Sequence, residues 1–220
     1  MVPNSRSKRI SGQLYSKKEF LQYYLPRVRY MIDKKMKKLN IGSSTPKGVH
    51  RDKPWVNIDA NLGFADYRGG NLVIGSGCSL PFKNECFDEV IAIHVLEHLP
   101  RDLHLPFLTE AARVLAPSGV LFIEVPNFLQ ICSNIGDLTR QLVKETDPQN
   151  IAIIKELIRR ATLSIYGKGR QPFDFHHWGF SPWALRELGL KLNLNGSLET
   201  EMISNHYTQE PVLLMKYTKQ

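Results

Sequence analysis

The chain has 220 residues, of which 42% are hydrophobic and 23% are charged. This length suits one domain with an insertion, and this composition excludes an intrinsically disordered chain. No apolar run approaches the roughly 18 residues of a membrane span, and none follows the basic N-terminus, so we expect neither a transmembrane helix nor a secretory signal. Three cysteines without a CxxC pair predict reduced thiols in a cytoplasmic protein without a metal site.

The net charge of +8 is concentrated near the N-terminus. Residues 1–40 hold 11 Lys and Arg against Glu19 and Asp33, so they carry +9 and the remaining 180 residues carry −1. We expect residues 1–38 to form a basic arm, with a helix from Ser16 to about residue 24. The arm is either a solvated tail and helix face or a surface for nucleic acid, anionic lipid or an acidic glycan.

The first half of the chain alternates short apolar runs with crossovers. Five runs predict buried strands: Leu39–Ile41, Trp55–Ile58, Asn71–Ile74, Phe87–Ile93 and Val120–Val125. The crossover between Gly42 and Trp55 contains two prolines, so we expect a loop there. Residues 102–115 predict a helix, with Leu105, Leu108, Ala112 and Leu115 on one side.

The second half departs from this rhythm. Residues 127–172 look polar and loop-like apart from a helix at Ile151–Leu163, and we expect a cap over the carboxyl edge of the sheet. A helix at 182–190 precedes two strands, Glu199–Ser204 and Val212–Tyr217. The pattern predicts an α/β, Rossmann-like, doubly wound and mostly parallel sheet with a C-terminal antiparallel hairpin, a basic N-terminal helical arm and a helical cap insertion.

Motifs between residues 39 and 128 follow one another at characteristic spacings. They are Leu39-Asn40-Ile41-Gly42-Ser43-Ser44, the strand ending at Asp59, Leu80-Pro81-Phe82, His94-Val95-Leu96-Glu97-His98-Leu99, and the turn Arg113-Val114-Leu115-Ala116-Pro117-Ser118-Gly119. Their order resembles the small class I methyltransferases that use S-adenosylmethionine. The resemblance makes residues 39–220 a methyltransferase domain with the cap at about 127–172.

The resemblance implies a cofactor site along the carboxyl ends of the strands. Gly42 permits a close backbone approach, whereas Ser44 replaces a second glycine common in the family. Asp59 would bind the ribose hydroxyls, with Asp66 a weaker rival, and Ser76 stands where relatives often carry an acidic residue facing adenine. The predicted cofactor-binding residues are Asn40, Gly42, Ser43, Ser44, Asp59, Ala60, Ser76, Gly77, Cys78, Leu80 and His94.

The segment Phe173-Asp174-Phe175-His176-His177-Trp178-Gly179-Phe180 is dense in aromatic and imidazole side chains. It could bind and deprotonate an acceptor, because the pKa of histidine lies near neutrality, or it could be a packed aromatic corner. Similar segments occur in relatives associated with cell-surface sugar pathways. If one residue is a general base, we choose His176, with His177 second, and we assign Glu97, His98 and Asp88 to structure.

These features predict an S-adenosylmethionine-dependent methyltransferase with a saccharide-linked or small-molecule acceptor. Two alternatives stay open. Ser44 and Ser76 would suit a non-catalytic, methyltransferase-like binding module, and the sheet would also suit a nicotinamide-linked oxidoreductase. The second alternative is disfavoured because the chain has no GxGxxG motif.

Overall fold

A computed structural model describes residues 37–43, 55–60, 72–169, 174–192, 194–201 and 211–220. The predicted arm helix from Ser16, the 44–54 crossover, Ser44 and Asp66 lie outside the described residues.

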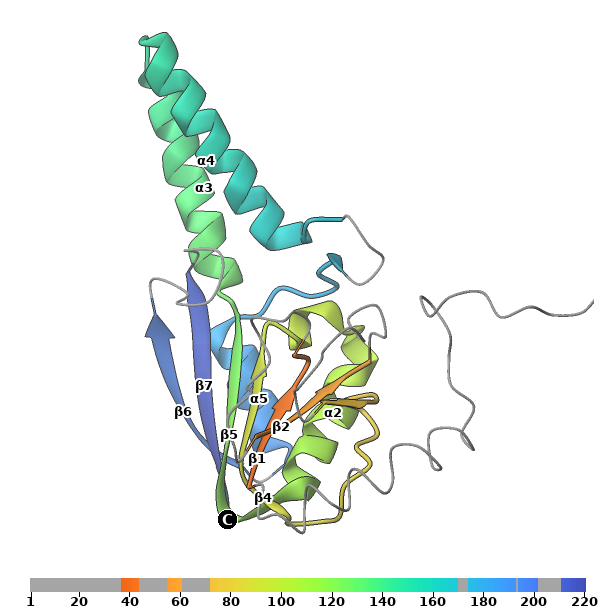
Figure 1. Cartoon of the computed structure of the whole chain (residues 1–220). Coiled ribbons are helices and arrows are strands. Elements are labelled where there is room, and N and C mark those ends of the chain that lie inside the picture. Colours follow the sequence, from red (N-terminus) through yellow and green to blue (C-terminus); the bar gives the residue numbers. More distant parts are fainter. Residues whose placement is uncertain (1–36, 44–54, 61–71, 170–173, 193, 202–210) are drawn as a thin grey trace, which may run out of the picture.

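Seven strands form one sheet in the order β3-β2-β1-β4-β5-β7-β6 (Figure 1). They are β1 (Lys38–Ile41), β2 (Trp55–Asp59), β3 (Leu72–Ile74), β4 (Phe87–Ile93), β5 (Leu115–Pro126), β6 (Leu194–Glu201) and β7 (Val212–Lys219). Strands β1 to β5 are parallel, and β7 is antiparallel to both β5 and β6. This confirms the predicted Rossmann-like fold. The strand order reverses between β1 and β4, which is where open α/β sheets bind ligands.

Two strands begin five residues before their predicted starts. Strand β6 begins at Leu194, five residues before the predicted start, because it pairs with β7 from Leu194 opposite Lys219 to Glu201 opposite Val212. Strand β5 begins at Leu115, so the predicted turn at 117–119 lies within it, and Ser118 there has φ of +62°. Both starts are set by pairing with strands that are distant in the sequence, so the local sequence does not predict them.

Helix α2 (Arg101–Val114) has a different buried face from the predicted one. Leu108 is buried as expected, but Leu105 is 40% exposed. The face against the sheet consists of His104, Phe107, Leu108, Ala111 and Val114. The error has a physical reason: the large ring of Phe107 fills the core, and a helix turned to bury Leu105 would leave it outside.

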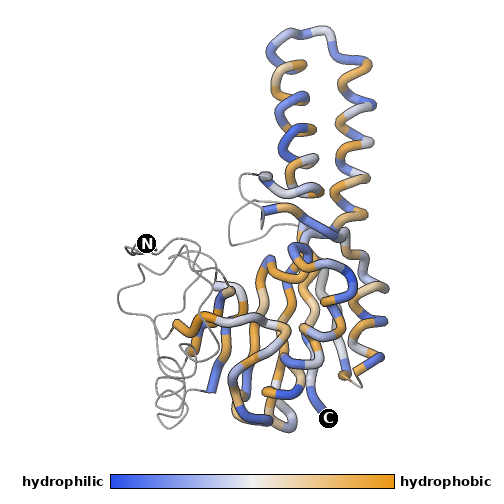
Figure 2. Tube along the Cα trace, turned by 90° about the vertical axis from the view of Figure 1, so that its right-hand side faces the viewer, coloured by the Kyte–Doolittle hydropathy of each residue, from blue (hydrophilic) through white to orange (hydrophobic). Residues whose placement is uncertain are grey.

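A helical hairpin, α3 (Phe128–Lys144) with α4 (Pro148–Tyr166), projects from the carboxyl end of β5 (Figure 1). The prediction of a loop before residue 151 was wrong for 128–144. Both helices have side-chain caps, because Asn127 accepts from the Gln130 amide and Asp147 from the Gln149 and Asn150 amides. Hydrophobic residues are concentrated in the strands of the sheet, whereas the hairpin mixes hydrophobic and hydrophilic residues (Figure 2).

Helix α5 (Pro182–Leu190) has the predicted bounds. The hydroxyl of fully buried Tyr217 on β7 donates to the Leu185 carbonyl at 2.5 Å, which attaches α5 to the antiparallel end of the sheet. Among the described residues, no helix combines the length and apolar character needed to span a bilayer.

Candidate cofactor and acceptor site

The turn after β1 requires glycine. Gly42 has φ of +75°, its amide donates to the Ile58 carbonyl at 2.8 Å, and a Cβ there would lie 2.4 Å from Val95 Cγ2. The next residue, Ser43, is 3% exposed, and its Oγ has no hydrogen-bond partner among the described residues. Buried hydroxyls normally have partners, so this turn suits a polar ligand group close to the backbone.

The ends of β2 and β3 lie beside this turn. Asp59 ends β2, and its backbone carbonyl accepts from the Gly75 amide at 2.9 Å. Ala60 follows it and is exposed. Asn40 instead lies inside the sheet, where its amide nitrogen donates to Asn57 Oδ1 at 3.0 Å. The fold therefore brings Gly42, Ser43 and Asp59 to one edge and commits the Asn40 side chain to a strand-to-strand contact.

The loop after β3 contains the next predicted group. Ser76 is exposed, and its Oγ accepts from the Cys78 amide at 3.1 Å, which shapes a tight turn. Gly77 packs on α2, since a Cβ there would lie 2.5 Å from the Phe107 ring. Leu80 is 5% exposed and belongs to the hydrophobic core. The loop is thus held in one shape close to the ends of β2 and β3.

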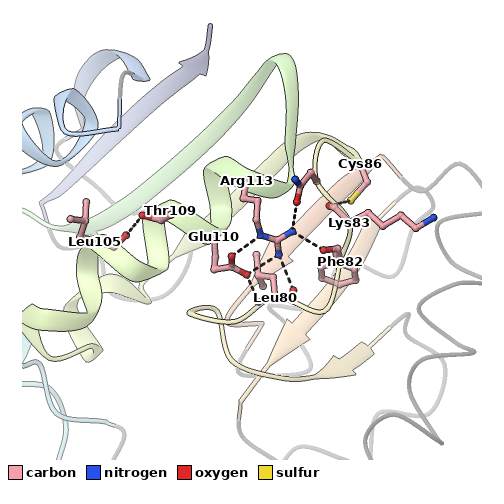
Figure 3. A network of polar contacts seen from close by, with 9 residues as sticks. Leu80, Phe82, Lys83, Cys86, Leu105, Thr109, Glu110 and Arg113 are labelled. Carbon is pink, nitrogen blue, oxygen red and sulfur yellow. Dashed lines mark hydrogen bonds and ion pairs between the residues drawn. The ribbon is translucent and has the colours of Figure 1, made fainter.

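An arginine on α2 fastens this loop, and the sequence interpretation missed it (Figure 3). Arg113 donates to the carbonyls of Leu80 at 2.9 Å and Phe82 at 2.8 Å, and it pairs with Glu110. Glu110 in turn accepts from the Leu80 amide at 2.7 Å. The hydrogen bond from Arg113 holds the pKa of Glu110 below its usual range. The i, i+3 spacing of Glu110 and Arg113 was the available signal, whereas the sequence interpretation used Arg113 only as the start of the turn at 113–119.

His94, directly after β4, lies between two carboxylates. It has φ of +52°, its Nδ1 lies 2.9 Å from Glu97 Oε1, and its Nε2 lies 3.2 Å from Glu124 Oε1. Burial alone would lower the pKa of His94, but the contacts with Glu124 and Glu97 outweigh it and raise the pKa to about 10. His94 is therefore cationic at neutral pH and cannot accept a proton from a substrate.

Glu97 belongs to a short 3-10 helix, η2 (Leu96–His98), and is 1% exposed. Burial would raise its pKa, but the ion pair with His94 keeps the pKa below the usual value. The Glu97 carbonyl accepts from the His177 amide at 2.7 Å. The segment 174–180 consequently lies against η2 at the carboxyl edge of the sheet.

Two imidazoles meet at this contact. The rings of His98 and His176 have centroids 4.7 Å apart at 80°. His98 Nδ1 lies 3.1 Å from the Phe175 carbonyl, and His176 Nδ1 lies 3.0 Å from the Ser164 carbonyl on α4. A small hollow beside them is lined by residues from the base of the hairpin and the 176–179 segment. His177, the second choice for a base, is exposed and does not belong to this pair of rings.

Aromatic side chains on this edge stay accessible. Phe175, Trp178, Trp183 and Tyr166 are exposed. The Arg101 guanidinium lies 4.7 Å from the centroid of the Trp178 ring. The segment is therefore a partly open aromatic surface, with Phe180 alone of its aromatic rings among the described residues buried in the core.

Comparison with known proteins agrees with this geometry. Residues 49–123 match the family described as "Methyltransferase domain". A protein of Mycolicibacterium smegmatis named "Probable S-adenosylmethionine-dependent methyltransferase" is 31% identical over 140 residues, which are 60% of this chain and 51% of that protein. The chain thus spans about half the length of that relative.

Solved structures share the fold. A SAM-dependent methyltransferase of Thermotoga maritima aligns over 92% of this chain and 96% of its own, with a TM-score of 0.52 and 16% identity. One from Archaeoglobus fulgidus covers 90% and 91%, with a TM-score of 0.51 and 15% identity. Residues 49–123 thus match a methyltransferase domain in sequence, and the chain shares its fold with these S-adenosylmethionine-dependent methyltransferases.

Proposed function

We propose that this chain transfers a methyl group from S-adenosylmethionine to a saccharide-linked or small-molecule acceptor. The observation that carries the proposal is that the Gly42 turn, Ser43 and Asp59 meet beside the point where the strand order reverses. The Ser43 hydroxyl there has no hydrogen-bond partner among the described residues. A compact polar ligand with an anionic end and vicinal hydroxyls suits this set.

Each proposed cofactor-binding residue would contact the part of S-adenosylmethionine that lies nearest to it. The backbone at Gly42 and Ser43 would receive the carboxylate of the methionine part, and Asp59 the two ribose hydroxyls, each through a charge-assisted bond. The turn of exposed Ser76 and half-buried Gly77 and Cys78 would border adenine, with Leu80 as apolar support behind it. His94 would hold the end of β4 in place through its two carboxylates.

When bound, the cofactor supplies a methyl group on a sulfonium: the acceptor lone pair forms the new bond to carbon, and the old bonding pair stays on sulfur. The protein chiefly has to align the two reactants. A hydroxyl acceptor must also lose its proton. His176 suits that step because its Nδ1 is held by the Ser164 carbonyl, which directs the basic character to Nε2.

The exposed aromatic surface at this edge supports the proposed acceptor class. The exposed rings of Phe175, Trp178 and Trp183 offer flat apolar faces, which stack well on the apolar faces of sugar rings. A negatively charged macromolecule would instead bind the basic residues 1–40. Nucleic acid or an anionic surface is therefore proposed as a partner of that arm only. The unpaired thiols of Cys78, Cys86 and Cys132 favour a reducing compartment such as the cytoplasm.

Calorimetric titration with S-adenosylmethionine and S-adenosylhomocysteine tests the proposal. We expect Asp59→Ala to weaken both by at least about tenfold, which corresponds to about 1.4 kcal/mol. Asp88→Ala is the matched control, because Asp88 is an exposed aspartate at the opposite end of β4. Equal affinity in wild type and Asp59→Ala would remove Asp59 from the site.

The non-catalytic binding module is the second candidate. The observation in its favour is that the Ser76 hydroxyl is used within its own turn. That alternative predicts no affinity for either cofactor form, whereas methyl transfer to any acceptor would eliminate it.

A further inference from the structure

We propose that Glu97, His98 and His176 bind one divalent transition-metal ion at the carboxyl edge of the sheet. One ligand atom from each of the three side chains lies within 4.8 Å of the other two. Two imidazoles with one carboxylate form a ligand set that zinc and other divalent transition metals use when they keep positions open for substrate.

The two imidazoles are already oriented as metal ligands usually are. A backbone carbonyl can only accept a hydrogen bond, so the Phe175 carbonyl fixes the proton of His98 on Nδ1, and the Ser164 carbonyl does the same for His176. In a neutral ring the lone pair is then on Nε2. Metal-binding histidines typically donate their other ring N–H to a carbonyl or carboxylate in this way.

The burial of Glu97 supports the metal site independently of the two histidines. It is 1% exposed, its Oε1 contacts His94, and its Oε2 has no hydrogen-bond partner among the described residues. A buried carboxylate oxygen left without a partner is costly, and a cation would satisfy it. Moreover, Glu97 and Glu124 are two carboxylates around the single imidazole of His94, so negative charge stays in excess whether or not that ring is protonated.

The geometry needs only a small adjustment. Two ligand atoms on one tetrahedral zinc ion lie about 3.4 Å apart, because each bond is about 2.1 Å. The ligand atoms of the cluster, which lie within 4.8 Å of one another, must therefore move closer by up to about 1.4 Å. His98 and His176 are both partly exposed, so rotation of either ring can close the difference. Glu97, in contrast, is held by its contact with His94, so it is the ligand whose position is fixed.

The ion would lie where an acceptor must approach. An acceptor hydroxyl bound to it would lose its proton to water while the oxygen kept the electron pair, because a bound cation lowers the pKa of an oxygen ligand. This role rests on the proposed function. It also replaces His176 as a general base, since the ion occupies the Nε2 that a base would use.

Calorimetric titration of the metal-free chain with Zn²⁺ tests the site. We expect one ion per chain and a loss of affinity of at least about a hundredfold in His98→Ala and in His176→Ala. His177→Ala is the matched control for metal binding, because it removes a neighbouring but exposed imidazole outside the cluster. The histidine variants replace partly exposed side chains, and circular dichroism melting shows whether they fold.

Substitution with Co²⁺ identifies the ligand atoms. A nitrogen and oxygen site gives visible bands without the intense near-ultraviolet band of thiolate ligation, and those bands should disappear in His98→Ala. Absent binding, equal binding in all variants, or a thiolate band would each overturn the proposal. Titration of the same samples with S-adenosylhomocysteine separates the two ideas: cofactor binding without metal binding ends only the metal site, and metal binding without cofactor binding ends only the methyltransferase.

Discussion

Replacement of Gly42 by alanine should lower the stability of the fold and weaken binding at the proposed cofactor edge. A non-glycine residue at φ of +75° costs about 1–2 kcal/mol. The new Cβ would lie 2.4 Å from Val95 Cγ2, so the valine must move, and such overpacking costs about 1–3 kcal/mol. Alanine also restricts the unfolded chain, which offsets about 0.4–1 kcal/mol. The net expectation is a loss of about 2–4 kcal/mol in the free energy of unfolding.

Urea unfolding and titration with S-adenosylhomocysteine measure the two effects. The double variant Gly42→Ala, Val95→Ala removes the clash and keeps the backbone strain, so it separates the two costs by comparison with Val95→Ala alone. Gly136→Ala is the control: this glycine lies within α3, a Cβ there meets only Arg140 at 3.6 Å, and the helix should gain about 0.5–1 kcal/mol. A Gly42→Ala variant within about 0.5 kcal/mol of wild type, with unchanged affinity, would refute the reasoning.

Three further predictions concern the scaffold around the site. Arg113→Ala should lower the free energy of unfolding by about 2 kcal/mol, since it removes charged hydrogen bonds to two carbonyls, and Arg113→Lys should not restore it in urea titrations. The folded pKa of Glu110 lies below the unfolded value of about 4.3. Its stabilising contribution is therefore complete above that pH and is lost as pH falls through the folded pKa. Glu110→Gln should reduce the acid-side loss of melting temperature in pH-dependent melting, and an unchanged slope would contradict the pairing with Arg113. Tyr217→Phe should cost about 1 kcal/mol in the same unfolding assay, because the Leu185 carbonyl loses its buried donor, whereas a neutral effect would show that water replaces it.

The parallel core of the fold was predictable because its signals are local. Strand β4 is a nearly continuous apolar run, and both its ends matched the prediction. The start of helix α5 is likewise indicated by Ser181, whose hydroxyl caps the helix, and by proline at the first helical position. In such elements composition, periodicity and end signals agree, so a short window of sequence suffices.

The helical hairpin was harder because most of its stability does not come from burial in the domain. Among the described residues of α3, only Ile131 is buried, and in α4 only Ile154. A helix that buries so few apolar side chains resembles a polar loop in sequence, and α3 was therefore missed. Its capping residue, Asn127, was a usable signal, since Asn before an apolar residue commonly starts a helix.

The acceptor edge depended on contacts that no local pattern encodes. His98 and His176 are 78 positions apart in the chain, and they meet because α4 returns its carboxyl end to the sheet, where the Tyr166 carbonyl accepts from the His176 amide at 3.1 Å. The hairpin thus contributes to this edge through its last turn, which supplies the Ser164 carbonyl that orients His176. Shortening α4 by one turn should therefore disturb His176 while leaving Gly42 and Asp59, which depend on β1 and β2, able to bind the cofactor. A single histidine in a polar loop could be selected from sequence as a candidate, but its partner, its tautomer and its position against Glu97 follow only from the path of the intervening helices.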